Sequence, residues 1–168
     1  MLHVCSLAHL PGTVQETGAS HVITVMANVA QVRRPASILA DNHLLISMDD
    51  IIEEADGFTA PAIAHVERVL AFGRSWNRSA PMVVHCYAGI SRSTASAFAI
   101  ACALNPHRSE AQIAQQIRSA SACAFPNRLI VSHADSLLGR DGRLIRALAE
   151  MGPGDLTVEG RPFRIDIE

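Results

Sequence analysis

Short apolar segments recur along the first half of the chain with the length and composition of β-strands. They cover residues 2–7, 21–26, 43–48 and 82–85. The second is β-branched and almost continuously apolar, which is typical of a strand covered on both faces, as in a parallel sheet. We therefore expect an α/β fold in a single domain, with a central, mostly parallel sheet of about four to five strands flanked by helices.

Segments with apolar residues at helical spacing lie between and after these strands. Leu10-Pro11-Gly12 opens a short helix that ends near Gly18. Farther on, Thr59 is a candidate cap and Pro61 a candidate first-turn residue for a helix through Gly73. Later helices are expected from about Arg92 to Leu104, from a capping box at Ser109 to Gln112 onward, over 127–138 and over 144–151.

The last part of the chain has a different pattern. Gly152-Pro153-Gly154 interrupts the helical pattern, and residues 162–167 alternate like an edge strand. We therefore predict a principal domain over residues 1–150. The C-terminal tail over 151–168 is expected to contribute an edge strand that packs on the same domain.

Composition and charge exclude several classes of protein. Of the 168 residues, 49% are hydrophobic and 18% charged, which is typical of a soluble globular domain. The net charge is −2, so we expect no broad basic surface for nucleic acid or an anionic membrane. The N-terminus lacks the pattern of a signal peptide, and the most apolar run, 94–104, is too short to span a bilayer.

The four cysteines, Cys5, Cys86, Cys102 and Cys123, are widely spaced and form no C-x-x-C pair. This spacing indicates neither a zinc site nor a disulfide framework. Unpaired thiols favour a reducing compartment, so we expect a cytoplasmic location. For Cys5 and Cys102 we expect burial as small hydrophobic side chains.

Residues 83–94 have the pattern of a buried strand, a loop of small residues and the start of an apolar helix. This layout is typical of an anion-binding loop, because loop N–H groups and a helix N-terminus, with about half a positive charge, can face one oxyanion. Gly89 permits a left-handed turn, and the Arg92 guanidinium can bind two phosphate oxygens. Cys86 would lie at the bottom of the loop, where the same field favours its thiolate. The alternative is a buried structural cysteine.

The segment HCYAGISRS resembles the motif of cysteine-based protein tyrosine phosphatases, which is His-Cys, five residues, then Arg and Ser or Thr. Over residues 2–140 the order of elements is similar to that of dual-specificity and related small, bacterial-type tyrosine phosphatases, and ACAFPNRLIVSHADSLL resembles their C-terminal Pro-Asn helix. The resemblance implies a phosphatase domain over 1–150. The chain has no Lys and no Asn-Arg-Tyr loop of the larger classical enzymes, which implies a shallower pocket.

The resemblance also implies a role for each residue of the motif. Cys86 would be the nucleophile, Arg92 would bind the equatorial phosphate oxygens, and Ser93 would donate a hydrogen bond to the departing thiolate. His85 would order the loop through hydrogen bonds. The other residues expected around the phosphate are Tyr87, Ala88, Gly89, Ile90 and Ser91. This chemistry requires no cofactor and no metal.

A general acid is needed to protonate the leaving oxygen, and the resemblance places it on the loop after the third strand. Asp50 fits the family pattern of an apolar strand end, one residue and then Asp. Asp49 is the close alternative, because the register can slip by one residue. Asp56 is the third candidate, although Gly57 beside it indicates a turn. The competing interpretation is that these aspartates only cap the loop.

These roles imply hydrolysis of phosphotyrosine in a protein substrate, with phosphoserine and phosphothreonine as further options, through a phosphocysteine intermediate. Two alternatives stay open: a phosphatase of a small phosphate monoester, and a catalytically weak phosphate-binding protein. The five residues between Cys86 and Arg92 carry no basic side chain, which disfavours a polyphosphorylated substrate. The sequence indicates neither the physiological substrate nor the oligomeric state.

Overall fold

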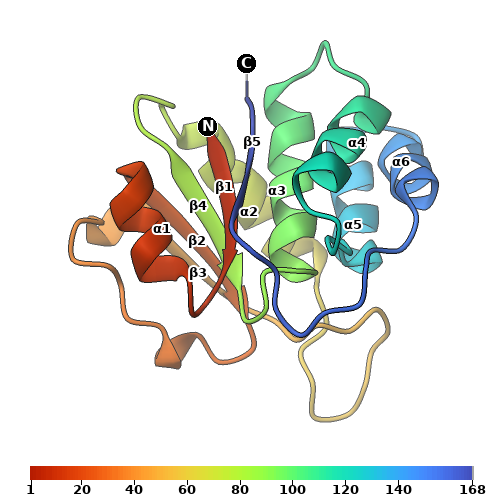
Figure 1. The fold of residues 1–168 in the computed structure, drawn as a ribbon. Helices are drawn as coiled ribbons and strands as arrows, with labels where there is room; N and C mark the ends of the chain where they lie inside the picture. The colour runs from red at the N-terminus through yellow and green to blue at the C-terminus, as the bar shows by residue number, and fades with distance from the viewer. Residues whose placement is uncertain (168) are drawn as a thin grey trace.

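The computed structural model describes residues 1–167 (Figure 1). Five strands and six α-helices form this part of the chain, joined by loops that include two single 3-10 turns, Val29–Gln31 and Ala40–Asn42. The elements are β1 (Leu2–Ser6), α1 (Leu10–Thr17), β2 (His21–Met26), β3 (His43–Ser47), α2 (Ile63–Ser75), β4 (Met82–Cys86), α3 (Arg92–Leu104), α4 (Glu110–Ala120), α5 (Arg128–Leu138), α6 (Arg143–Met151) and β5 (Phe163–Ile165).

The strands form one sheet in the order β3-β2-β4-β1-β5. β1, β2, β3 and β4 pair in parallel, which confirms the expected α/β fold with a mostly parallel sheet. β5 is the antiparallel edge strand, and its partner is β1, with Leu2 opposite Ile165. In the β1–β4 pair, Ser6 lies opposite Cys86, so the loops that follow these two strands leave the sheet side by side.

Helices cover both faces of the sheet, as the apolar strands require. Figure 1 shows α1 on one side and the layer of α2 to α6 on the other. The smaller core packs Leu10 and Val14 of α1 against Val22 and Val83. The larger core surrounds α3, whose residues are buried over almost its whole length. Within residues 1–167, no helix has the length and apolarity needed to cross a membrane.

Of the helix starts predicted from local sequence, that of α4 is confirmed and that of α2 is not. The capping box is confirmed, because Ser109 Oγ accepts from Gln112 N–H at 3.2 Å while the Gln112 side chain accepts from Ser109 N–H at 3.1 Å. The start predicted at Thr59 and Pro61 is wrong, since α2 begins at Ile63. Thr59 instead pairs with the loop after β3, and the helix is capped by the His65 ring, which accepts from Ala62 N–H at 3.1 Å.

Candidate active site

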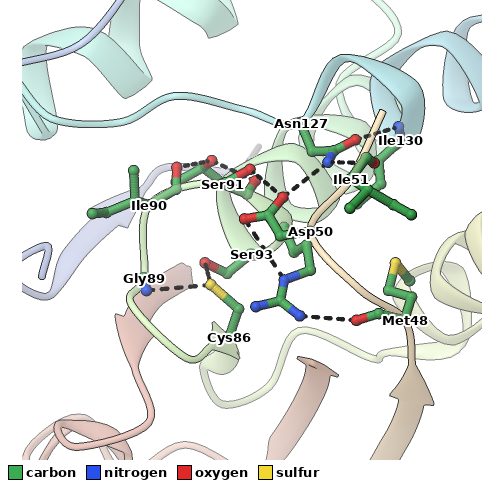
Figure 2. Close-up of polar contacts among 12 residues, drawn as sticks. Met48, Asp50, Ile51, Cys86, Gly89, Ile90, Ser91, Ser93, Asn127 and Ile130 are labelled. Atoms are coloured by element: carbon green, nitrogen blue, oxygen red, sulfur yellow. Dashed lines mark hydrogen bonds and ion pairs between the residues drawn. The ribbon is translucent and has the colours of Figure 1, made fainter. Parts of the chain in front are cut away.

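β4 carries Cys86 to the end of the sheet, and the loop 87–91 then leads into α3. The Cys86 side chain is nearly buried, with 2% of the residue exposed. Its Sγ accepts a hydrogen bond from Gly89 N–H at 3.2 Å and lies 3.1 Å from Ser93 Oγ (Figure 2). A backbone donor and a hydroxyl thus face the same sulfur atom.

Three carbonyl groups of the loop accept hydrogen bonds from segments outside it. Tyr87 O accepts from Leu7 N–H at 3.1 Å, Ile90 O from Phe125 N–H at 2.9 Å and Ser91 O from Asn127 N–H at 3.3 Å. In a trans peptide the N–H of the next residue points away from the carbonyl. The N–H groups that follow these carbonyls are therefore turned toward the inside of the loop, which is the arrangement of an anion-binding nest.

Gly89 is needed at its position for two reasons. Its φ is +72°, a backbone angle that residues other than glycine rarely adopt. A Cβ there would also lie 2.7 Å from Ser6 N and 2.8 Å from Cys5 C, inside van der Waals contact with the backbone of β1. The loop thus lies directly on β1, which explains why the small residue is required where the sequence has it.

Arg92 is the first residue of α3 and is 8% exposed. One guanidinium nitrogen, Nη1, donates to Met48 O at 2.8 Å. Nε is buried without a hydrogen-bond partner in the described structure, and its nearest carboxylate oxygen, Asp50 Oδ2, is 3.8 Å away. A buried charged donor that is left unpaired is unfavourable. The guanidinium therefore holds, beside the loop, a donor that has no hydrogen-bond acceptor among residues 1–167, and such a donor suits an anionic ligand.

The three candidate acids occupy different positions. Asp50 Oδ1 accepts from Ser91 Oγ at 2.7 Å, and Figure 2 shows this carboxylate beside the loop that contains Cys86. Asp49 is turned toward Thr59, whose N–H donates to Oδ2 at 2.7 Å. Asp56 is exposed and lines a pocket of about 920 Å³ together with residues such as Phe58. The structure thus brings Asp50, rather than Asp49, into contact with the residues of the motif.

Asn127 is a residue of this site that the sequence analysis missed. Its Nδ2 donates to Asp50 Oδ1 at 2.9 Å and to Ile51 O at 3.1 Å. Its Oδ1 accepts from the N–H groups of Leu129 and Ile130, so the same side chain also caps α5. The Pro-Asn start of this helix was the available signal. The sequence alone does not show that the Asn127 amide group reaches Asp50 in the loop after β3.

His85 is fully buried below the loop. Its Nδ1 lies 3.4 Å from Cys86 O, and its Nε2 lies 2.6 Å from Thr24 Oγ1. Desolvation is the main reason that the pKa of His85 is lowered to about 4, so the ring is neutral at pH 7. Because a carbonyl only accepts, Nδ1 carries the ring hydrogen and Nε2 accepts from the Thr24 hydroxyl. Thr24 can then accept from His43 Nε2, 2.8 Å away.

Acidification is expected to destabilise the fold through His85. Its pKa of about 4 in the folded state lies below the ordinary value of 6.5, so between these pH values the unfolded chain binds more protons. The free energy of unfolding should therefore fall by about 3 kcal/mol as the pH drops from 7 to 4. Urea titrations at pH 7, 5.5 and 4 measure this loss.

The His85→Gln variant is the matched control for this effect, because glutamine does not titrate but can still hydrogen-bond to Thr24. The loss of unfolding free energy on acidification should be smaller in this variant than in the wild type. Equal losses in both proteins would contradict the assignment of the effect to His85. The pKa of His43 is also lowered by burial, so a part of the acid sensitivity should persist.

The other thiols differ from Cys86 in their surroundings. Cys5 is 1% exposed and Cys102 is 2% exposed, which confirms that both are buried. Desolvation raises the pKa of each thiol to about 12, so neither is a nucleophile at neutral pH. Cys123 is partly exposed and lies 3.5 Å from Ser121 Oγ.

No family model and no curated protein matches the chain. Solved structures do match it, and three of them are described below. Human DUSP28 is 22% identical, over 80% of this chain and 86% of that chain, with a TM-score of 0.61. A mouse putative dual specificity phosphatase complexed with zinc tungstate is 17% identical, over 88% and 86%, with a TM-score of 0.64. The PTP-2 phosphatase of Cydia pomonella is 18% identical, over 80% and 84%, with a TM-score of 0.63. This chain has the fold of the dual-specificity phosphatases.

Proposed function

We propose that the protein is a cysteine-dependent phosphatase that hydrolyses phosphotyrosine, and also phosphoserine or phosphothreonine, in phosphorylated proteins. The observation that carries the proposal is the convergence of three groups on one loop. Cys86 Sγ accepts from the Gly89 N–H, Ser93 lies beside it, and Nε of the buried Arg92 guanidinium has no hydrogen-bond partner among the described residues. A tetrahedral oxyanion above the sulfur would pair with that guanidinium and with the inward N–H groups.

The reaction follows from this arrangement in two steps. The Cys86 thiolate attacks phosphorus, the S–P bond forms as the bond from phosphorus to the leaving oxygen breaks, and Asp50 gives its proton to that oxygen. Water then attacks the phosphocysteine, Asp50 takes a proton from it, and the S–P bond breaks to release phosphate. The Ser93 hydroxyl, 3.1 Å from Sγ, donates to the thiolate as it departs.

Electrostatic stabilisation is the main contribution of the loop to this reaction. As the phosphoryl group transfers, charge spreads over its equatorial oxygens, and donors that are already oriented need no reorganisation. The contacts of Tyr87 O, Ile90 O and Ser91 O with outside segments supply that fixed orientation. Arg92 adds the only side-chain cation within the motif.

The first test is hydrolysis of p-nitrophenyl phosphate over pH 5 to 7. The wild type should release p-nitrophenol, and orthovanadate should inhibit it, because vanadate is an oxyanion of similar shape. Phosphotyrosine and phosphoserine peptides of the same sequence then compare the substrate classes. An inactive, folded wild type that still binds vanadate would show that the protein only binds phosphate, and would contradict the proposal.

The general acid is tested with the neighbouring aspartates. Asp50→Ala should lower kcat by about 100-fold, because the leaving oxygen loses its proton donor. Asp49→Ala is the matched control and should change kcat much less, because the carboxylate of Asp49 binds Thr59 N–H in the structure. A larger loss of kcat in Asp49→Ala than in Asp50→Ala would show that the wrong residue has been assigned.

A further inference from the structure

The segment 152–162, between α6 and β5, crosses the molecule at the loop that contains the proposed nucleophile. Figure 1 shows it, in blue, running from α6 back to the sheet edge beside β1. It is attached to the body on the way: Arg118 Nη2 donates to Gly152 O at 2.9 Å, and Asp155 N–H donates to Ala122 O at 2.9 Å. Farther along, Gly160 and Glu159 reach the anion-binding loop and the end of β1.

One of these contacts orients a peptide group of the loop. Gly160 N–H donates to Ala88 O at 2.9 Å. The same peptide unit carries the Gly89 N–H, which donates to Cys86 Sγ at 3.2 Å. Because the carbonyl and the N–H of a trans peptide point in opposite directions, a bond that holds the carbonyl outward also holds the N–H toward the sulfur.

A second contact joins the segment to the end of β1. Ser6 Oγ donates to Glu159 Oε1 at 2.6 Å, and His9 Nδ1 lies 3.5 Å from the same oxygen. Ser6 is the residue that pairs with Cys86 across the sheet. Glu159 therefore attaches the segment to the strand residue beside Cys86. The next residue along the chain, Gly160, binds Ala88.

Close packing explains the glycine at position 160. A Cβ there would lie 3.0 Å from Gly89 O and 3.4 Å from Cys123 Sγ, so a larger residue would press on the loop. By contrast, the side chains of Leu156 and Val158 on the same segment are almost fully exposed. The contacts of the segment with the anion-binding loop and with β1 are thus made by residues 159 and 160.

We propose that Gly160 and Glu159, in the segment 152–162, are positioning residues of the phosphate-binding site, which aim the Gly89 N–H at the sulfur and at the bound oxyanion. This inference rests on the proposed function. The C-terminal tail thus contributes the Gly160 N–H, which binds the Ala88 carbonyl and so orients the peptide group that carries the Gly89 N–H. The segment touches neither the sulfur nor the substrate itself.

The test measures the affinity for tungstate, a tetrahedral oxyanion that is not hydrolysed, by calorimetry on folded protein. Gly160→Ala should weaken tungstate binding about tenfold, the equivalent of one misaligned N–H bond to a charged ligand. Glu159→Ala should weaken it severalfold and should also speed hydrogen exchange of the loop amides. The matched controls are Gly12→Ala, where a Cβ meets nothing within 4 Å, and Val158→Ala, and both should bind like the wild type.

A purely structural role would lower the thermal unfolding midpoint but would leave the affinity of the folded molecules unchanged. Tungstate affinities of both variants within twofold of the wild type would therefore overturn the inference. If Gly160→Ala does not fold, Glu159→Ala alone decides by the same criterion. Failure of the proposed function is separate, since it would appear as a wild type that does not hydrolyse p-nitrophenyl phosphate whatever the variants bind.

Discussion

Replacing Cys86 by serine is expected to lower kcat for p-nitrophenyl phosphate by at least about 10⁴-fold, because the hydroxyl is a far weaker nucleophile than a thiolate at neutral pH. The variant should still bind vanadate or tungstate, since the loop is held by its contacts with outside segments and the Arg92 guanidinium is held by Met48 O. Steady-state kinetics and calorimetry on the same preparation measure the two effects. A Cys86→Ser variant that keeps more than about 1% of the wild-type kcat would contradict a phosphocysteine intermediate.

The matched control for this experiment is Cys102→Ala. Cys102 lies on α3, far along the helix from Arg92, and its thiol is buried in the core with a pKa raised to about 12 by desolvation. Its removal should cost about 1 kcal/mol of unfolding free energy through the small cavity that it leaves. It should leave kcat close to that of the wild type, because this thiol takes no part in the reaction.

Replacing Arg92 by alanine is expected to lower kcat/KM by about 10³-fold and to abolish measurable vanadate inhibition. The physical reason is the loss of a preorganised, desolvated cation whose Nε has no other hydrogen-bond partner among the described residues. Arg92→Lys keeps the charge but loses the planar fork that binds two oxygens, so it should recover only a small part of the activity.

Arg164→Ala is the control for Arg92, because Arg164 lies on β5 and its mostly exposed guanidinium pairs with Asp166, directly after the strand. It should behave like the wild type in both assays. Equal kinetic losses in Arg92→Ala and Arg164→Ala would show that the effect of Arg92 is a general one of charge, and would remove the support for an oxyanion at its guanidinium.

The pattern along the chain predicts most of the fold, because the signals that set it are local. The near-continuous apolar run of β2 predicts a strand with two covered faces, and Ser109 with Gln112 predicts the start of α4. The start of α2 was misplaced because Thr59 is held by Asp49, ten residues earlier, and this pairing outweighs its tendency to cap a helix.

The sequence alone specifies the strand, loop and helix around Cys86, because adjacent residues with the right backbone preferences are enough to form them. It left Asp49 and Asp50 as competing acids, and it contained no sign that Asn127 or Gly160 reaches the site. These contacts form only in the packed fold, where Asp50 meets Asn127, 77 residues later, and Gly160 binds Ala88. The physical reason is that such contacts depend on how packed elements align in space, which local propensity does not encode.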